Sequence, residues 1–463
     1  MTLALKLKYA FRHAMKRNPL VPRRCADLMS RERADPVVHL ARQRALVTQL
    51  LAEACNVPAY ECRTALPSDT DPLDYLREAF PIIDKGEVLQ RPSSFLRKGR
   101  VPSHRLMVAE TSGTTGTPFD VYRSFNSMVM EESFHLQHWH WAGWRPGVKQ
   151  AVLRGETVVP IRRRQPPYWF TDPAGGQLVL STRHLDRHSA VLFISELQRF
   201  GATHLRAYPS AAHALAAFAE EAGVRLHFDA VITGSEMLYD FQRERIERVF
   251  GCHVFDFYGM TERVAYAAEC EHGRMHVNPE YGVLEIVDAQ GRPTNQEGTI
   301  IGTSLNNSAM PLIRYRMNDT ARWNHEPCPC GRTYPVIERI VGRLADQLYD
   351  LDGRAVNCTM IGFAFDGMHN IRKAQVAQTE VDQWVIRIVP GAGYTTLDSE
   401  RVLAKLGKQV SSRIAARIEL REDIPALPSG KYKWVVQECS RNTHPPRSVQ
   451  ANAVPKRISR AAR

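Results

Sequence analysis

The sequence contains no run of about 20 apolar residues, the length that a membrane-spanning helix requires. We therefore expect no transmembrane segment. The opening stretch, MTLALKLKYAFRHAMKRNPLVPRR, is basic and partly amphipathic, but it lacks the continuous apolar core and cleavage site of a secretory signal. It favours a basic helix of a soluble protein over an organelle-import or membrane-surface segment.

Cysteine is scarce as well. The nine cysteines of the 463-residue chain are too scattered for a disulfide scaffold, so we expect a reducing compartment and place the protein in the cytoplasm. No zinc-finger, RRM or helix-turn-helix signature accompanies the net charge of +12, so we expect no nucleic-acid partner. The basic balance also suits polyanionic small substrates such as nucleoside triphosphates.

The chain lacks a P-loop, whose final Gly-Lys-Ser/Thr places a lysine on the outer phosphates. Residues 111–118 instead read TSGTTGTP, an uncharged stretch in which two glycines and a proline prevent regular structure. Its hydroxyl and backbone N–H donors suit a phosphate, although a surface linker would have the same composition. Strand-like stretches at 106–109 and 121–124 flank it, so we expect this loop at the tip of a hairpin.

From residue 187 onward, helix-like and strand-like segments alternate, which indicates a largely parallel α/β sheet. Ligands bind such sheets beyond the carboxyl ends of the strands. Two turns lie at such ends, 232–237 (ITGSEM) and 256–262 (DFYGMTE). After residue 280, short strands and turns predict a β-rich subdomain.

The C-terminal part of the chain predicts a compact α+β unit that could act as a lid. A strand is expected at 383–390, a helix at 401–418 and another strand at 431–436. The polar, basic tail is predicted to be disordered. We divide the chain into a basic N-terminal segment (1–36), a large N-terminal domain (37–341), the lid domain (342–440) and the tail (441–463).

Two separate stretches could form a metal site. CEHGRMH (270–276) and CPCG (328–331) supply three cysteines and two histidines. Three thiols and one histidine match a closed tetrahedral zinc site, with Cys270, Cys328 and Cys330 as the sulfur ligands. We prefer His276 over His272 as the fourth ligand, because an apolar, strand-like residue follows it. Free cysteines in a β-rich subdomain remain the alternative.

The loop at 111–118, the two turns, MPLIRYRMND (310–319) and PSGKYKWV (428–435) occur in one order that resembles the acyl-adenylate-forming superfamily. The sequence is most similar to the phenylacetate–coenzyme A ligase family, which includes relatives in capsular polysaccharide biosynthesis. The resemblance implies an α/β fold: a large AMP-binding domain with parallel and mixed sheets and a β-rich subdomain, and a small mobile α+β lid.

The chemistry implied by the resemblance has two halves. A carboxylate attacks the α-phosphate of ATP, which releases pyrophosphate and gives an acyl-adenylate. A thiol, usually that of coenzyme A, then takes the acyl group after the lid has rotated. The implied partner is a small-molecule carboxylate, and relatives suggest a monomer or a homodimer.

The resemblance also implies roles for individual residues. Lys431 would neutralise the α-phosphate and the carboxylate as they meet, Thr261 would reach the α-phosphate, and Glu262 would hold Mg2+. Tyr258 would stack near the adenine of ATP or AMP, and Asp319 would bind the ribose. The remaining nucleotide contacts would come from Thr111, Ser112, Gly113, Thr114, Thr115, Gly116, Gly234, Ser235, Glu236, Gly259 and Arg343.

Two positions depart from the family pattern. Asn318 stands where glycine usually precedes the ribose-binding aspartate, and asparagine tolerates a left-handed backbone, so we expect the turn to survive. Ala345 stands where a hinge residue is usual, with Asp346 next, so the pivot stays open.

The sequence leaves the acid and the acceptor open. Trp139, Trp141, Trp144 and Tyr208 can equally form an aromatic wall for an aryl acid or belong to the core. Coenzyme A is the leading acceptor. The alternatives are a hydroxyl, amine or carrier in cell-surface polysaccharide or secondary-metabolite biosynthesis, and a non-catalytic nucleotide-binding scaffold.

Overall fold

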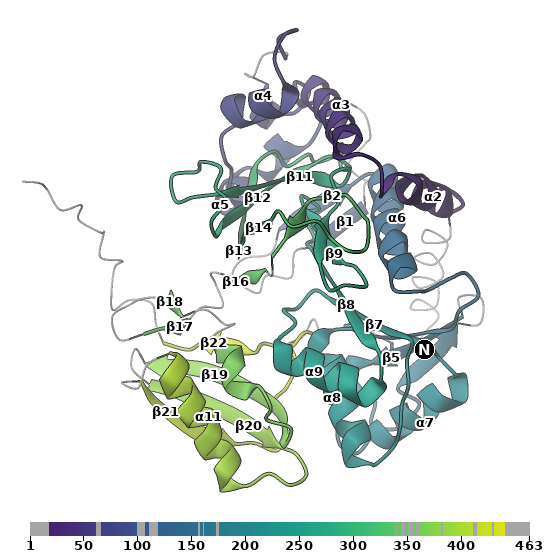
Figure 1. Ribbon diagram of the computed structural model, residues 1–463, viewed down its shortest axis with the longest axis vertical. Coiled ribbons are helices and arrows are strands. Elements are labelled where there is room, and N and C mark those ends of the chain that lie inside the picture. The colour runs from purple at the N-terminus through teal and green to yellow at the C-terminus, as the bar shows by residue number, and fades with distance from the viewer. Residues whose placement is uncertain are drawn as a thin grey trace, which may run out of the picture.

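The computed structural model places the chain in two bodies (Figure 1). The smaller body, drawn in yellow-green, is built mainly from residues 361–439, and the larger body holds most of the preceding chain. In the part of the chain that is described, no helix is both long and apolar enough to cross a membrane. The described residues are 18–61, 66–99, 107–110, 119–155, 158–160, 162–172, 176–338, 340–343, 348–350, 355–356, 361–380, 383–410, 414–427 and 430–439.

The N-terminal helices begin at aspartate caps. The described chain opens with α2 (Leu20–Arg31), α3 (Pro36–Ala54), η1 (Pro58–Tyr60), α4 (Pro72–Ala79), α5 (Lys85–Gln90) and η2 (Pro92–Phe95). The Asp35 side chain accepts the Val37 N–H, and Pro36 occupies the first position of α3, where a missing N–H costs nothing. Asp71 and Asp84 cap α4 and α5 in the same way.

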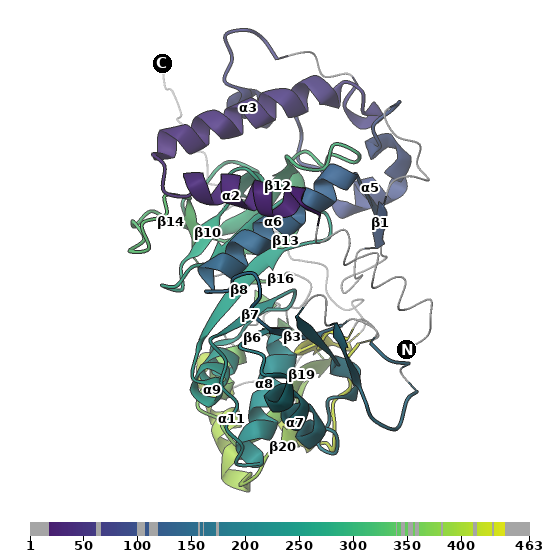
Figure 2. The same cartoon turned by 90° about the vertical axis from the view of Figure 1, so that its right-hand side faces the viewer.

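The segment 1–36, which we separated from the N-terminal domain, is described from residue 18 and packs on the larger body. Val21, Cys25 and Leu28 of α2 are buried, and α2 lies along α6 (Phe125–Trp141), as Figure 2 shows. The Ser133 hydroxyl of α6 donates to the Val21 carbonyl. This described part therefore belongs to the N-terminal core.

The glycine- and threonine-rich loop joins two antiparallel strands, as predicted. β1 (Met107–Glu110) pairs with β2 (Asp120–Arg123), and residues 111–118 connect them. The loop itself, with Thr111, Ser112, Gly113, Thr114, Thr115 and Gly116, lies outside the described residues.

A ten-stranded sheet forms the centre of the larger body in the described chain, in the order β14-β15-β10-β9-β8-β7-β6-β3-β5-β4. Its middle strands β5, β3, β6, β7 and β8 run parallel, which confirms the predicted α/β architecture. The strands are β3 (Gln150–Arg154), β4 (Trp169–Asp172), β5 (Gln177–Ser181), β6 (His204–Ala207), β7 (Ala230–Gly234), β8 (His253–Gly259), β9 (Tyr266–Glu269), β10 (Met275–Val277), β14 (Trp323–Asn324) and β15 (Val336–Ile337).

Helices cover the parallel strands because these strands are apolar on both faces. All five residues of β7 are buried, as expected for a strand with layers on each side. Left-handed glycines at Gly201 and Gly251 end two of the covering helices, since glycine adopts this conformation without strain. The covering helices are η4 (Thr182–His184), α7 (Ala190–Phe200), α8 (Pro209–Glu221) and α9 (Asp240–Phe250).

The predicted β-rich subdomain is a four-stranded antiparallel sheet of β11 (Gly282–Val287), β12 (Gly298–Ser304), β13 (Tyr315–Ala321) and β16 (Val341–Arg343). The expected left-handed turn at Asn318 is wrong. Asn318 lies inside β13, and the left-handed residues other than glycine in the described chain are Ser235, Arg263 and Arg314. A register shift between Asp319 and Thr320, against β16, replaces the turn.

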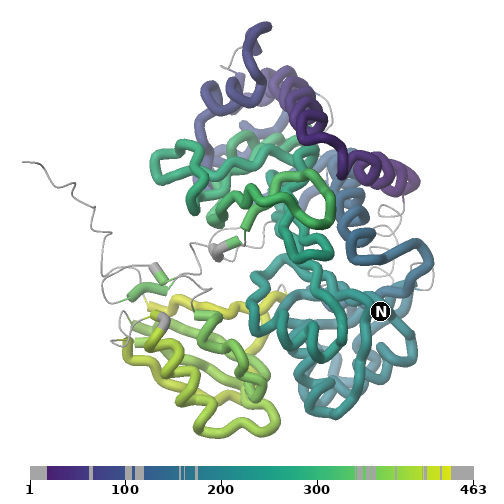
Figure 3. Tube along the Cα trace, viewed as in Figure 1, coloured from purple at the N-terminus to yellow at the C-terminus, as the bar shows by residue number. Residues whose placement is uncertain are grey.

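The C-terminal body is a sheet in the order β21-β20-β19-β22 with one long helix, and Figure 3 shows it as a separate unit. The predicted helix at 401–418 is wrong beyond residue 409. Ala416 and Ile418 alternate with exposed neighbours in a strand that pairs with β20, and this pairing overrides the helical pattern. The elements are β17 (Leu348–Tyr349), β18 (Ala355–Val356), η6 (Phe363–Phe365), β19 (Ile371–Glu380), β20 (Gln383–Pro390), α11 (Thr396–Gln409), β21 (Ala415–Leu420) and β22 (Val435–Gln437).

The C-terminal body packs on α8 and α9 through charged and aromatic contacts. Arg245 of α9 donates to the carbonyls of His369 and Ile371, the latter at 2.7 Å. Arg372 binds both carboxylate oxygens of Glu221 at 2.9 and 2.7 Å. These contacts fix the orientation of the C-terminal body on the larger one. Their aromatic neighbours are Tyr239, Phe241, Phe365 and Trp434.

We predict that acidification lowers the free energy of unfolding because of His138. This side chain packs among Trp141, Phe255 and Phe257. Burial lowers the pKa of His138 from 6.5 to about 3. Protonation of His138 therefore favours the unfolded chain. The stability that the neutral side chain allows is complete above pH 6.5, and it is lost as the pH falls toward 3. Each pH unit in that window costs about 1.4 kcal/mol.

The measurement is the denaturant midpoint between pH 7 and pH 5 for the wild type, His138→Leu and the exposed control His188→Leu. The His138→Leu midpoint should depend less on pH than the other two. Equal pH dependence in all three proteins would contradict the assignment.

Candidate functional site

The two predicted turns lie side by side at one edge of the large sheet. β7 and β8 are parallel neighbours, so the residues that follow them meet beyond their carboxyl ends. Ser235, Glu236 and Tyr258 line one cavity of about 870 Å³, and Asp319 and Lys431 line it as well. A cavity of this size suits a nucleotide-sized ligand.

Close packing of the two strands requires glycine at position 234. A Cβ on Gly234 would lie 2.5 Å from the Phe257 ring, closer than any real contact. The next residue, Ser235, has a φ of 71°, an uncommon left-handed conformation for serine. Strained backbone of this kind often occurs at ligand sites.

Glu236 ties the C-terminal body to the cavity. Its Oε1 accepts the Tyr432 N–H at 2.6 Å, and its Oε2 accepts the Ser210 N–H, in the first turn of α8, at 3.2 Å. Burial raises the pKa of Glu236, while the two N–H donors and nearby Lys431 act in the opposite direction. The sequence placed Glu236 only beside the adenine and missed this second role.

Tyr258 and Asp319 form a pair on the cavity wall. The Tyr258 hydroxyl donates to Asp319 Oδ2 at 2.7 Å, and the Asp319 side chain is 9% exposed. The backbone of Arg343 lies opposite Asp319 in the register of β13 and β16. The Arg343 side chain is outside the described part of the structure.

Thr261 and Glu262 follow β8 and Gly259 in a turn beside the β1–β2 hairpin. Arg123 of β2 donates to the Thr261 carbonyl at 2.6 Å, and the Tyr315 hydroxyl donates to Glu262 Oε1 at 3.4 Å. The hairpin that carries the loop 111–118 is therefore anchored at this turn.

Asp256 lines the same cavity, although the sequence analysis did not select it. The Thr233 hydroxyl donates to Asp256 Oδ1 at 2.6 Å. Burial and the neighbouring carboxylate of Glu269 raise the pKa of Asp256 to about 7. Its position at the start of DFYGMTE, facing a strand-end cavity, was the available signal.

The predicted metal ligands come together in space. The ligand atoms of Cys270, His276, Cys328 and Cys330 all lie within 4.8 Å of one another. Cys270 Sγ lies 3.6 Å from Cys328 Sγ, and Cys330 Sγ lies 3.4 Å from His276 Nε2. His272 contributes only its backbone N–H, at 3.4 Å from Cys270 Sγ.

These separations fit a tetrahedral zinc ion. Zn–S and Zn–N bonds of about 2.3 and 2.05 Å imply S···S and S···N separations of about 3.8 and 3.6 Å. Backbone N–H groups of His272 and Arg332 point at sulfurs. His276 Nδ1 lies 3.4 Å from the Tyr334 carbonyl, a contact that leaves Nε2 to face the cluster.

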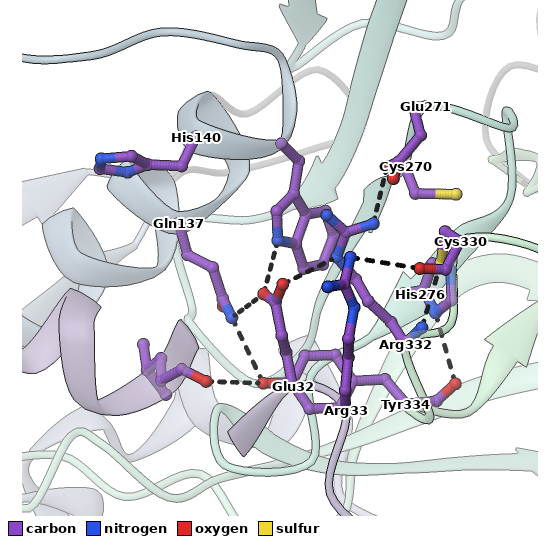
Figure 4. Close-up of polar contacts among 12 residues, drawn as sticks. Glu32, Arg33, Gln137, His140, Cys270, Glu271, His276, Cys330, Arg332 and Tyr334 are labelled. Carbon is purple, nitrogen blue, oxygen red and sulfur yellow. Dashed lines mark hydrogen bonds and ion pairs between the residues drawn. The ribbon is translucent and has the colours of Figure 1, made fainter. Parts of the chain in front are cut away.

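A buried polar network joins the cluster to α2 and α6 (Figure 4). Glu32 accepts hydrogen bonds from the Trp141 indole at 2.8 Å and from Gln137 at 3.2 Å. Its other oxygen lies 3.3 Å from the Arg332 guanidinium, which also covers the Trp141 ring. The network therefore connects the Cys-X-Cys stretch to the N-terminal helices.

The structure separates the aromatic candidates. Trp139 and Trp141 are buried in the core around Cys270 and Cys330, with Trp144 packed against it. Tyr208 is also buried, in the core around the parallel strands, and it directly follows β6 and precedes α8. All four aromatic residues therefore pack in or against the core, and Tyr208 differs from the tryptophans in following a parallel strand at its carboxyl end.

The sequence model of the AMP-binding enzyme family matches residues 22–304, more than half of the chain. The chain belongs to the AMP-binding enzyme family. The acyl-adenylate-forming resemblance inferred from the motifs is thereby confirmed. A second family model, the CapK C-terminal domain, matches residues 348–438 of this AMP-binding enzyme.

Curated relatives agree with this membership. Protein CapK of Staphylococcus aureus is 24% identical over 77% of this chain and 79% of its own length. A phenylacetate–coenzyme A ligase of Thermus thermophilus is 28% identical over 52% of this chain and 55% of its own length.

Solved structures share the fold. A 2-hydroxyisobutyryl-CoA ligase in a postadenylation state superimposes with a TM-score of 0.68 at 18% identity, covering 87% of this chain and 90% of its own. The same ligase in a thioesterification state gives 0.52 at 19% identity, covering 88% and 91%. Both likenesses show that this AMP-binding enzyme shares the fold of that ligase.

Proposed function

We propose that this AMP-binding enzyme uses ATP and Mg2+ to convert a small carboxylic acid to an acyl-adenylate, and then transfers the acyl group to coenzyme A. The observation that carries the proposal is the position of Lys431. Glu236 binds the N–H of the adjacent Tyr432, so Lys431 lines the cavity together with Ser235, Tyr258 and Asp319. A cation from the C-terminal body thus joins a site built at the sheet edge.

In the proposed first step, a carboxylate oxygen attacks the α-phosphorus of ATP, and the bond to the bridging oxygen of pyrophosphate breaks. Negative charge from both reactants gathers at the new bond. Lys431 would stabilise this charge, and a preorganised cation in such a site can supply a few kcal/mol. Glu262 would hold Mg2+, a hard cation that prefers carboxylate and phosphate oxygens.

The nucleotide would lie across the cavity wall. Tyr258 would stack near the adenine, and Asp319, held by the Tyr258 hydroxyl, would accept the ribose hydroxyls. We add Asp256 as an acceptor for the adenine amino group, because it lines the cavity beside Tyr258. Thr261 and the loop 111–116 would contact the phosphates, and Arg343 would contact the nucleotide from β16.

We also propose that the C-terminal body is the lid domain. β16 pairs with β13 of the larger body, so the backbone of residues 342 and 343 belongs to the N-terminal sheet. A movement of the lid would therefore begin beyond Arg343.

A second acceptor class has its own support. The C-terminal residues 348–438 match the CapK C-terminal domain, and Protein CapK aligns over more of this chain than the phenylacetate–coenzyme A ligase does. Because the lid of such enzymes takes part in the second half-reaction, a hydroxyl, amine or carrier acceptor is the alternative to coenzyme A.

We predict that Lys431→Ala lowers acid-dependent pyrophosphate release from ATP and Mg2+ by about 100-fold or more, since each 1.4 kcal/mol of lost transition-state stabilisation costs a factor of ten. Release would be measured across aryl, fatty and sugar acids, with and without coenzyme A. Lys408→Ala, at an exposed position of α11 in the same body, is the control and should retain most activity.

Formation of an acyl–coenzyme A product would show that the acceptor is the thiol of coenzyme A rather than a hydroxyl, amine or carrier. Acid-dependent release that is equal in the wild type and Lys431→Ala would remove the lysine from the mechanism. ATP binding by calorimetry without release for any acid would instead support the scaffold alternative.

We further propose that Cys270, His276, Cys328 and Cys330 hold a structural Zn2+. Purified protein should contain about one zinc per chain by elemental analysis, and Cys328→Ser should lose it. Each 1 kcal/mol lost from a domain of about 200 residues lowers Tm by about 2–4 °C, so we expect a drop of at least about 5 °C. The control is Cys55→Ser, at an exposed position. A metal-free wild type that is as stable as the zinc-loaded protein would contradict the proposal.

A further inference from the structure

Arg154 lies at the edge of the sheet where the proposed nucleotide site is built. It is the last residue of β3, which runs parallel to β6, and β6, β7 and β8 follow side by side. The residues at the carboxyl ends of these four strands therefore converge. We call Arg154, Tyr208, Ser235 and Phe257 the Arg154 site.

The Arg154 guanidinium is held by a hydroxyl and two aromatic rings, none of which carries a negative charge. One N–H donates to Ser235 Oγ at 2.6 Å. The guanidinium carbon lies 5.4 Å from the centre of the Tyr208 ring and 5.6 Å from that of Phe257, so two aromatic faces flank it. Since a guanidinium has five N–H donors and Ser235 takes one, donors remain for an incoming oxyanion.

Other arginines of the larger and smaller bodies are paired with carboxylates. Arg243, Arg332 and Arg372 contact carboxylates of Glu269, Glu271 and Glu221 at 2.6, 2.6 and 2.7 Å. Within the described residues, the partners of half-buried Arg154 are a hydroxyl and two rings. Removing a charge from water is costly unless an opposite charge compensates, which a ligand could supply.

The C-terminal body closes over the end of β3. A Cβ on Gly430 would lie 2.8 Å from Gly155 Cα and 3.0 Å from Thr182 Oγ1, so the backbones are in close contact. The Thr182 hydroxyl in turn donates to the Arg154 carbonyl at 3.3 Å. Because Lys431 follows Gly430, both Arg154 and Lys431 lie at this edge of the sheet. The reacting carboxylate needs only one of these two cations.

We propose that the Arg154 site binds a second anionic group on the acid substrate, so that the preferred substrates are small dicarboxylic or similarly dianionic acids rather than simple aryl or alkyl acids. This inference rests on the proposed adenylation. A planar guanidinium can bind a carboxylate through two parallel hydrogen bonds, and the aromatic rings restrict it to one plane.

The test compares acids in matched pairs, including succinate with butanoate and isophthalate with benzoate. We expect kcat/KM for pyrophosphate release to be at least about 10-fold higher for the dianionic member, since one tenfold step corresponds to about 1.4 kcal/mol. Arg154→Met should remove this preference and leave the monoacids and the KM for ATP unchanged. Arg154→Lys should restore part of it, and the exposed Arg225→Met is the control.

The α-phosphate of ATP is the other oxyanion that Arg154 could reach. If Arg154→Met raised the KM for ATP and slowed every acid equally, the proposal would be overturned in favour of a nucleotide contact. Adenylation of monoacids without a preference for dianionic acids would also overturn it, while the proposed function would stand.

Calorimetry of the same pairs on AMP-saturated protein separates this inference from adenylation. Tighter binding of the diacids that is lost in Arg154→Met would support the Arg154 site even if no pyrophosphate were released. Equal binding of both members of every pair would overturn it. Ser235→Ala removes the hydroxyl to which Arg154 donates, so it should weaken the preference, and any change in its KM for ATP is measured as well because Ser235 also lines the nucleotide cavity. This variant covers the case in which Arg154→Met does not fold.

Discussion

The two hydrogen bonds that Glu236 accepts are the interaction on which the rest of the site depends. One oxygen binds a backbone N–H in the first turn of α8 and the other binds Tyr432 of the C-terminal body. The carboxylate is thus shared between two bodies that also meet through Arg245 and Arg372, through the rings around Trp434 and through the close approach of Gly430 to Gly155. The Tyr432 N–H therefore ties the Lys431 loop to the turn after β7.

The Cys/His cluster serves a different purpose, although its Cys270 lines the same cavity as Ser235 and Tyr258. It joins the turn after β9 to the Cys-X-Cys stretch before β15, and Glu32 extends this connection to α2 through Arg332. A metal there would hold the far edge of the large sheet together. It would support the site through the rigidity of β9 and β10, which pair in sequence beside β8.

Local patterns were enough to predict the parallel sheet, the hairpin around residues 111–118 and the approach of Cys270 to Cys330, because each depends on spacing or on strand-end geometry. They failed where pairing between distant segments decides the outcome. Ile418 fits a helical stripe but lies in β21 because β20 is available beside it. Asn318 suits a turn but continues β13, and nothing near Arg154 in sequence indicates that Ser235 and Tyr208 surround it.

The measurement that tests this account most directly is single-turnover pyrophosphate release by Glu236→Ala beside Lys431→Ala, with acid and ATP saturating. If Glu236 holds the lysine in place, both variants should lose the first half-reaction to a similar extent, while transfer from added acyl-adenylate to the acceptor stays near the wild-type rate. Release by Glu236→Ala at the wild-type rate would contradict the account, because the Lys431 loop would then not need its anchor.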